Sequence, residues 1–195
     1  MTTSLRWTSR DLEAFPDNGK RYEIIDGELY VSKQPDYWHQ LACGTVFASL
    51  QDWSKASGAG FPNIAPGIIF AEDDDVAPDV VWISKSRLAG VLGDDGKLHA
   101  APDLVVEVLS PGTANEHRDR DVKLKLYSRR GVREYWILDW RARQIEVYRR
   151  KRAQLRLHAT LIEGDALDSP LLPGFSCTVS ELFEGFPPAG DEGSD

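Results

Sequence analysis

The chain has 195 residues, of which 42% are hydrophobic and 28% are charged. This length and balance predict one folded domain and exclude a disordered, collagen-like or coiled-coil protein. The longest apolar runs, such as Gly67–Ala71 and Leu104–Val106, are too short to cross a bilayer, and the first ten residues lack the apolar segment of a signal peptide. Cys43 and Cys177 are too few for a disulfide scaffold and wrongly spaced for a zinc site. We therefore expect a cytoplasmic protein without a membrane partner.

The charge is unevenly distributed along the chain. Lys and Arg number 23 against 31 Asp and Glu, and the resulting net charge of −8 argues against a polyanionic partner for the chain as a whole. Between Arg118 and Arg156, however, fourteen basic residues accompany five acidic ones, a local charge of +9. The sequence therefore indicates a basic face that suits a phosphate backbone. The alternative is that these arginines only solvate one helix and one hairpin.

Short elements are expected at the N-terminus. The segment Thr8–Asp11 has the spacing of a capping box, which predicts a short helix that ends before Pro16. Two strands, Arg21–Ile25 and Glu28–Ser32, flank the dipeptide Asp26-Gly27. Because Asp-Gly is typical of the tightest β-turns, these strands are expected to form a β-hairpin.

A long helix is expected from about Asp36 to Ser57, where apolar residues recur at helical spacing. Gly58 and Gly60 are expected to end it. The segments that follow are short, β-branched and bounded by Pro, Gly or Asp, so they are predicted to be strands. They are Ile68–Ala71, Asp79–Ile83 and Asp103–Leu109.

A second helix is expected over Asn115–Arg130, with Val122, Leu126 and Tyr127 on its buried side and Gly131 as its stop. This pattern predicts a mixed α/β (α+β) fold with a central mixed sheet flanked by helices, the N-terminal hairpin and additional C-terminal strands. One domain is expected over residues 1–185, followed by an acidic, mobile tail at 186–195. The remaining strands are expected at Arg133–Asp139, Gln144–Arg149 and Gln154–Leu161.

Three carboxylates interrupt apolar strands. Glu107 lies in a segment that should be buried on both faces, where an unpaired carboxylate costs several kcal/mol. Asp79 opens a second such strand and Glu23 interrupts a third, so the three are expected to converge on one divalent cation, magnesium or manganese. Two of them, Asp79 and Glu23, also have a structural interpretation. Asp79 follows Pro78 and would then be a turn residue, and Glu23 would pair with Arg21 or lie on the wet face of the hairpin.

Lys123 is the candidate cation for this site. It shares one face of the second helix with Tyr127, and a helix that packs across the sheet would bring its ammonium group toward Glu107. There it would orient an attacking water and stabilise charge that develops on a phosphate. The alternative is a solvated lysine on a basic helix, and Lys125 is the candidate for that role.

Short motifs run in a fixed order from about residue 8 to residue 162. They are Tyr22–Gly27, His39-Gln40, Pro78–Val81, Glu107–Pro111, Arg118-Asp119, Lys123 with Tyr127, and Gly131–Asp139. In this set and order the chain resembles the Uma-type restriction-endonuclease-like proteins of bacteria, within the PD-(D/E)XK nuclease superfamily.

The resemblance implies a restriction-endonuclease-like core that carries a magnesium-dependent phosphodiesterase site, with manganese as a substitute. Asp79 and Glu107 would be catalytic metal ligands, and the Val108 carbonyl a third ligand. The glutamate-x-lysine pattern of the superfamily has leucine at its last position here, Leu109. The resemblance therefore assigns the role of that lysine to Lys123.

Further roles follow from the same resemblance. Glu23 would be an additional catalytic carboxylate, and His39 and Tyr127 would be accessory residues. Independently of the resemblance, most of the four histidines, His39, His99, His117 and His158, are expected on the surface. The arginine-rich region after Arg118 is expected to contact the DNA backbone without readout of the base sequence, through Arg118, Arg129 and Arg130.

These residues predict a metal-dependent endonuclease that hydrolyses DNA phosphodiester bonds. Two alternatives remain open. A nucleic-acid-binding or regulatory module with weak or lost catalysis is favoured by the missing in-strand lysine, and a metal-dependent hydrolase of small phosphoesters is favoured by the overall acidity. The DNA target, the cleavage pattern and the choice between monomer and homodimer do not follow from the sequence.

Overall fold

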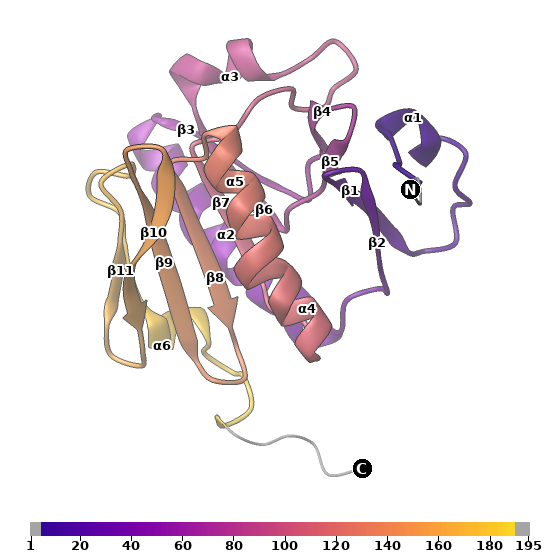
Figure 1. The fold of residues 1–195 in the computed structure, drawn as a ribbon. Helices are drawn as coiled ribbons and strands as arrows, with labels where there is room; N and C mark the ends of the chain where they lie inside the picture. The colour runs from indigo at the N-terminus through magenta and orange to yellow at the C-terminus, as the bar shows by residue number, and fades with distance from the viewer. Residues whose placement is uncertain (1–4, 190–195) are drawn as a thin grey trace.

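A six-stranded mixed sheet forms the centre of the computed structural model, which describes residues 5–189 (Figure 1). Its neighbouring strands β7 and β8 run parallel, and the other neighbours run antiparallel. In order across the sheet, the strands are β10 (Gln154–Leu161), β9 (Gln144–Lys151), β8 (Glu134–Asp139), β7 (Leu104–Val108), β6 (Val80–Ser84) and β3 (Gly60–Ile64).

A smaller sheet of four strands carries the N-terminal hairpin. The hairpin pairs Ile25 with Glu28 around Asp26 and Gly27, whose φ angles of 54° and 75° are both positive, as the predicted tight turn requires. The strands are, in order, β2 (Glu28–Ser32), β1 (Arg21–Ile25), β5 (Asp74–Val76) and β4 (Ile68–Ala71). Near the C-terminus, β11 (Ala166–Asp168) and β12 (Ser176–Thr178) form a separate pair.

Two long helical segments cover opposite faces of the central sheet (Figure 1). The first is α2 (Tyr37–Ser57). The second is one continuous helix made of α4 (Thr113–His117), the π-helical turn η1 (Arg118–Lys123) and α5 (Leu124–Arg130). The short helices are α1 (Ser9–Leu12), α3 (Lys85–Val91) and α6 (Val179–Leu182). Among the described helices, none combines the length and apolarity needed to cross a membrane.

Alternation of side chains along the central strands divides the core into two layers. In β7, Leu104 and Val106 pack with α2 and the C-terminal segment, whereas Val105 packs with α5 and the smaller sheet. Burial of each such side chain stabilises the fold by about 1.5–3 kcal/mol. Glu107 alternates onto the same face as Val105, so its carboxylate is directed toward the helix α4–α5.

Most of the predicted elements are present, and their bounds differ by one or two residues. Asp36 caps α2 by accepting a hydrogen bond from the His39 N–H (2.8 Å), and Gly58 ends it in the left-handed conformation. The prediction that Gly60 also ends this helix is wrong. Gly60 begins β3, where a Cβ atom would collide with the ring of Trp82 and the backbone of its partner strand.

The elements that the sequence did not indicate are short, and β3 also carries residues untypical of a strand. β3 contains Pro62 and Asn63, which a strand tolerates at the edge of a sheet. The packed core extends to Phe186, which is 6% exposed and contacts Trp38 and Trp140. Of the tail expected at 186–195, the part from residue 190 lies outside the described residues.

A buried carboxylate joins the smaller sheet to the end of α5. Asp74 in β5 is 1% exposed, accepts a hydrogen bond from the Asp26 N–H (2.8 Å) and forms ion pairs with Arg129 and Arg130. Burial alone would raise the pKa of Asp74, but these hydrogen bonds outweigh it and lower the pKa. The two arginines therefore hold the hairpin layer against the helix.

Asp74→Asn should lower the free energy of unfolding by about 3 kcal/mol, because removal of one member of a buried ion pair leaves its partners unsatisfied. The matched control is Asp73→Asn, whose carboxylate is 41% exposed and pairs with the exposed Arg6. That change should cost less than about 1 kcal/mol. Chemical unfolding of both variants measures the difference, and equal losses would contradict the structural role of Asp74.

Candidate active site

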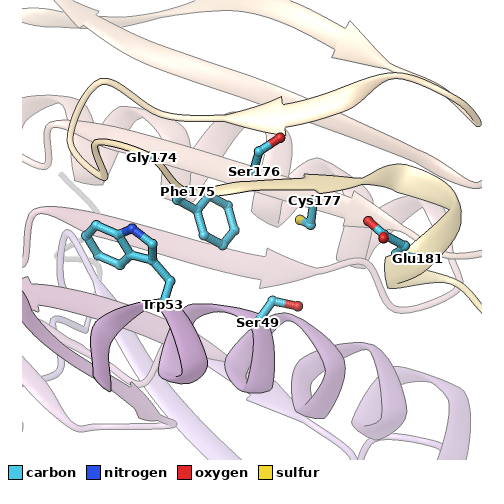
Figure 2. Close-up of a pocket in the computed structure, with 7 residues that line it drawn as sticks. All are labelled: Ser49, Trp53, Gly174, Phe175, Ser176, Cys177 and Glu181. Carbon is cyan, nitrogen blue, oxygen red and sulfur yellow. The ribbon is translucent and has the colours of Figure 1, made fainter. Parts of the chain in front are cut away.

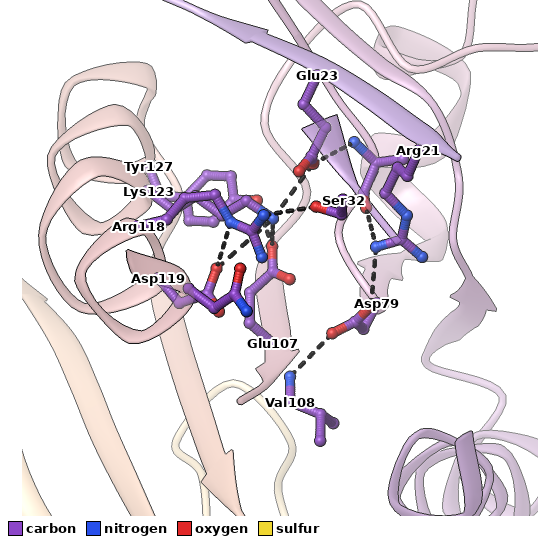
Figure 3. Close-up of polar contacts among 12 residues, drawn as sticks. Arg21, Glu23, Ser32, Asp79, Glu107, Val108, Arg118, Asp119, Lys123 and Tyr127 are labelled. Atoms are coloured by element: carbon purple, nitrogen blue, oxygen red, sulfur yellow. Dashed lines mark hydrogen bonds and ion pairs between the residues drawn. The ribbon is translucent and has the colours of Figure 1, made fainter. Parts of the chain in front are cut away.

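A cluster of buried charged side chains lies where β7 ends against the helix α4–α5 and the N-terminal hairpin (Figure 3). Segments far apart in the chain contribute to it: the hairpin, the start of α2, the residue before β6, the end of β7, and η1. Six of its side chains belong to residues that are at most 4% exposed: Glu23, His39, Asp79, Glu107, Asp119 and Lys123.

Asp79 connects three of these segments. Its Oδ2 accepts a hydrogen bond from the Val108 N–H (2.9 Å), its Oδ1 lies 3.0 Å from Nη1 of Arg21, and Nε2 of His39 lies 3.3 Å from Oδ2. Burial alone would raise the pKa of Asp79, but the His39 hydrogen bond and the charges of His39 and Arg21 lower it. Asp79 is therefore a buried carboxylate with partners on both oxygens, and it lies in the bend that precedes β6.

Lys123 lies at the centre of the cluster. Its Nζ is 2.9 Å from Oε1 of Glu107, 3.2 Å from Oε1 of Glu23 and 3.9 Å from Oδ1 of Asp119. Burial disfavours its charge, yet these three carboxylates outweigh that effect and raise its pKa. The ammonium group is therefore charged although the residue is only 1% exposed.

Glu107 is an acid of the cluster whose pKa is strongly raised. Its Oε1 accepts hydrogen bonds from Lys123 and from the Tyr127 hydroxyl (2.7 Å). Burial raises the pKa of Glu107 to about 8, with further contributions from the negative charges of Asp79 and Asp119, although Lys123 opposes the shift. Burial therefore favours the protonated form of Glu107 more strongly than water does.

Glu23 lies inside the cluster, so both structural interpretations offered for it are wrong. It is 1% exposed, and its Oε1 accepts a hydrogen bond from the Ala77 N–H at 3.0 Å. Arg21 forms its ion pair with Asp79 instead. Oε2 of Glu23 is buried and has no hydrogen-bond partner among the described residues.

The donor set suits a hard divalent cation. Asp79, Glu107 and Val108 line one polar pocket together with Asp119. Carboxylate and carbonyl oxygens are the ligands that magnesium and manganese prefer. The buried Oε2 of Glu23, which has no hydrogen-bond partner among the described residues, indicates that the cluster lacks positive charge. Its carboxylates Glu23, Asp79, Glu107 and Asp119 outnumber its permanent cations Arg21, Arg118 and Lys123.

The arginines predicted to contact DNA are engaged within the protein. Arg118 lines the pocket, where it donates to the Ser32 hydroxyl and to Asp119. Arg129 and Arg130 bind Asp74 at the far end of the same helix. Their guanidinium groups therefore already have carboxylate partners, and contact with DNA remains a prediction for all three.

Two members of the cluster were not singled out from the sequence as site residues. Asp119 lies four residues before Lys123 on the same helix, and this spacing was the signal available for it. Arg21 carries no signal, because its partner Asp79 is 58 residues away. His39 is buried beside Asp79. The prediction that most of the four histidines lie on the surface is confirmed, because the other three are exposed: His99, His117 and His158.

The fold and the family are those of a restriction-endonuclease-like nuclease. The chain belongs to the Uma2 family, described as "Putative restriction endonuclease", whose model matches residues 9–180. This match confirms the family that the ordered motifs predict.

One solved structure supports the fold class independently. A crystal structure described as a "putative nuclease belonging to DUF820", from Anabaena variabilis ATCC 29413, is 17% identical and superimposes with a TM-score of 0.72. The match covers 90% of this chain and 97% of that chain, and at this identity it shows the fold alone. No curated protein matches the chain.

The raised pKa of Glu107 predicts how stability depends on pH in the metal-free protein. Between its ordinary value of 4.5 and about 8, the folded protein keeps the proton that the unfolded chain releases. The melting temperature measured in EDTA should therefore fall as the pH rises from about 5 to about 8. Glu107→Gln should flatten this dependence, and Glu116→Gln, in the partly exposed α4, should not. The same pH dependence in wild type and Glu107→Gln would contradict the assignment.

Proposed function

We propose that the protein is a divalent-metal-dependent nuclease that hydrolyses DNA phosphodiester bonds. The observation that carries the proposal is the buried ammonium group of Lys123, which lies 2.9 Å from Glu107, a residue that lines the same pocket as Asp79. Buried ion pairs contribute little net stability, so a lysine kept among buried carboxylates is better explained by chemistry. Family membership supports the same reaction class.

Asp79, Glu107 and the Val108 carbonyl would hold the metal ion, magnesium or manganese. When bound, such an ion neutralises charge on a phosphate and lowers the pKa of the water it carries. Lys123 and Tyr127 both donate to Oε1 of Glu107. Among the described residues no donor binds Oε2, which is therefore the oxygen available to a ligand.

Lys123 would act on the water and the phosphate. An ammonium group has three donors, and two of them are directed at Glu107 and Glu23. The third would orient a water molecule or stabilise charge that develops on a phosphate oxygen. The Tyr127 hydroxyl would keep the Glu107 carboxylate in one orientation, which makes it a positioning residue. Glu23 would keep Lys123 charged and directed toward the site.

Cations at the pocket rim would attract the phosphate backbone. Arg21, Lys33 and Arg118 line the same pocket as Asp79, and Lys33 is exposed. Screening at physiological salt limits charge effects to about 8–10 Å, so these cations act locally despite the net charge of −8.

A second candidate function, hydrolysis of small phosphoesters, is favoured by one observation. Arg129 and Arg130, two of the arginines predicted to contact a DNA backbone, form ion pairs with the buried Asp74. To bind a small phosphoester, the protein would need only the cations that line the pocket, Arg21, Lys33 and Arg118. Because both functions use the same carboxylates and lysine, a comparison of substrates separates them.

Cleavage of plasmid DNA and of bis(p-nitrophenyl) phosphate, with and without magnesium, tests the proposal. Wild type should cleave plasmid in a magnesium-dependent reaction, and Asp79→Asn and Glu107→Gln should reduce cleavage to background while remaining folded. The control is Asp121→Asn, which changes an exposed carboxylate in η1, the helical turn that carries Lys123. This variant should retain full activity. Cleavage of the small ester alone would favour the second candidate, and no magnesium-dependent cleavage of either substrate would contradict both.

Duplex DNA binding should weaken steeply as salt is added, because each cation that contacts a phosphate releases a condensed counterion. Lys33→Ala should reduce the log–log salt slope by about 0.9. The matched control is Lys55→Ala, an exposed lysine at the other end of α2, which should leave the slope unchanged. Affinity that does not depend on salt, or equal effects of the two changes, would contradict phosphate binding at the pocket rim.

A further inference from the structure

Three buried side chains with different ligand atoms meet behind the carboxylate cluster. His39 and Cys43 lie four residues apart on one face of α2, with Sγ of Cys43 3.6 Å from Nδ1 of His39. On the other side of the imidazole, Nε2 lies 3.3 Å from Oδ2 of Asp79. One ligand atom from each residue falls within 4.8 Å of the other two.

This donor set differs in chemistry from the oxygen site beside it. A thiolate, an imidazole nitrogen and a carboxylate oxygen suit zinc or cobalt, whereas magnesium prefers oxygen ligands alone. Zinc bonds of about 2.0–2.3 Å in tetrahedral geometry place neighbouring ligand atoms within about 4 Å of each other. A rotation of the His39 ring and a small inward shift of the side chains would therefore bring the three atoms to bonding distance.

The surroundings allow an ion to reach this position. His39 and Asp79 form part of the wall of the polar pocket, and Cys43 lies behind His39 at 3% exposure. Three protein ligands leave a fourth position for water from the pocket, an arrangement typical of an open zinc site. The spacing of Cys43 and Cys177 did not predict this site, because only Cys43 contributes a ligand to it.

We propose that His39, Cys43 and Asp79 form a second metal site, selective for a thiolate-binding divalent ion such as zinc. When the ion binds, the Cys43 thiol releases its proton to solvent, and the imidazole gives up its hydrogen bond to Asp79 so that both can coordinate. Asp79 belongs to both donor sets, so zinc here would withdraw it from the magnesium site. Inhibition of cleavage by zinc rests on the proposed nuclease function, whereas zinc binding at the second site does not.

Cobalt(II) is a suitable probe, because a cobalt–thiolate bond produces a charge-transfer absorption band that oxygen and nitrogen ligands do not. Wild-type protein titrated with cobalt should develop this band to a stoichiometry of one, and excess zinc, but not excess magnesium, should abolish it. Cys43→Ser should lose the band, and Cys43→Ala should lose it as well. Circular dichroism and thermal melting of both variants check that the fold is retained.

The other cysteine provides the matched control. Cys177 lies in β12 and faces a separate pocket, between α2 and the C-terminal segment, with Ser49, Trp53 and Glu181 (Figure 2). Cys177→Ser should therefore keep the full band. Absence of the band in wild-type protein, its persistence in Cys43→Ser, or its loss in Cys177→Ser would overturn the proposal.

The effect on cleavage is measured separately. Stoichiometric zinc should inhibit the magnesium-dependent reaction of wild type at least tenfold more strongly than that of Cys43→Ser. Equal inhibition of the two proteins would overturn the link between the sites. If the protein cleaves no DNA at all, the cobalt band still decides whether the second site exists, so the two failures are distinguishable.

Discussion

The need to neutralise buried carboxylates determines how the site is built. Glu23 and Glu107 come from different sheets and Asp119 from the helix, and the single ammonium group of Lys123 lies within 3.9 Å of all three. Removal of that charge would leave several acids in a low-dielectric environment, where each isolated charge costs several kcal/mol. The helix α4–α5 must therefore pack across β7 at this point, which also fixes where the hairpin can lie.

The same principle accounts for most of the arginines. Asp74, Asp103 and Glu134 are buried carboxylates that bind arginines from the basic region of the chain. Part of the local surplus of positive charge in the sequence is thus paired with buried carboxylates inside the fold. The net charge of a segment does not show which groups its arginines bind, because acids distant in sequence become their neighbours on folding.

The sequence was most informative where a residue contradicted its surroundings. Glu107 in an apolar strand indicated a site, and the helical spacing of Lys123 and Tyr127 indicated which side chains could reach it. Local patterns likewise predicted the hairpin and the two long helical segments. The ion pair of Arg21 with Asp79 could not be predicted, since it depends on how the two sheets are placed relative to each other. The edge strand β3, which contains Pro62, was missed because it is stabilised by packing against β6 and not by its own propensity.

The central claim is that Lys123 acts in the reaction as well as in the fold, and its comparison with Lys125 on the same helix tests this most directly. Lys123 is buried and forms an ion pair with Glu107, whereas Lys125 is exposed. Single-turnover cleavage of DNA by Lys123→Met should be slower than wild type by at least about 100-fold, with DNA affinity nearly unchanged, because methionine keeps the packing volume and removes the charge. Lys125→Met should cleave at the wild-type rate. Equal rates for the two variants, with both proteins folded, would contradict the account.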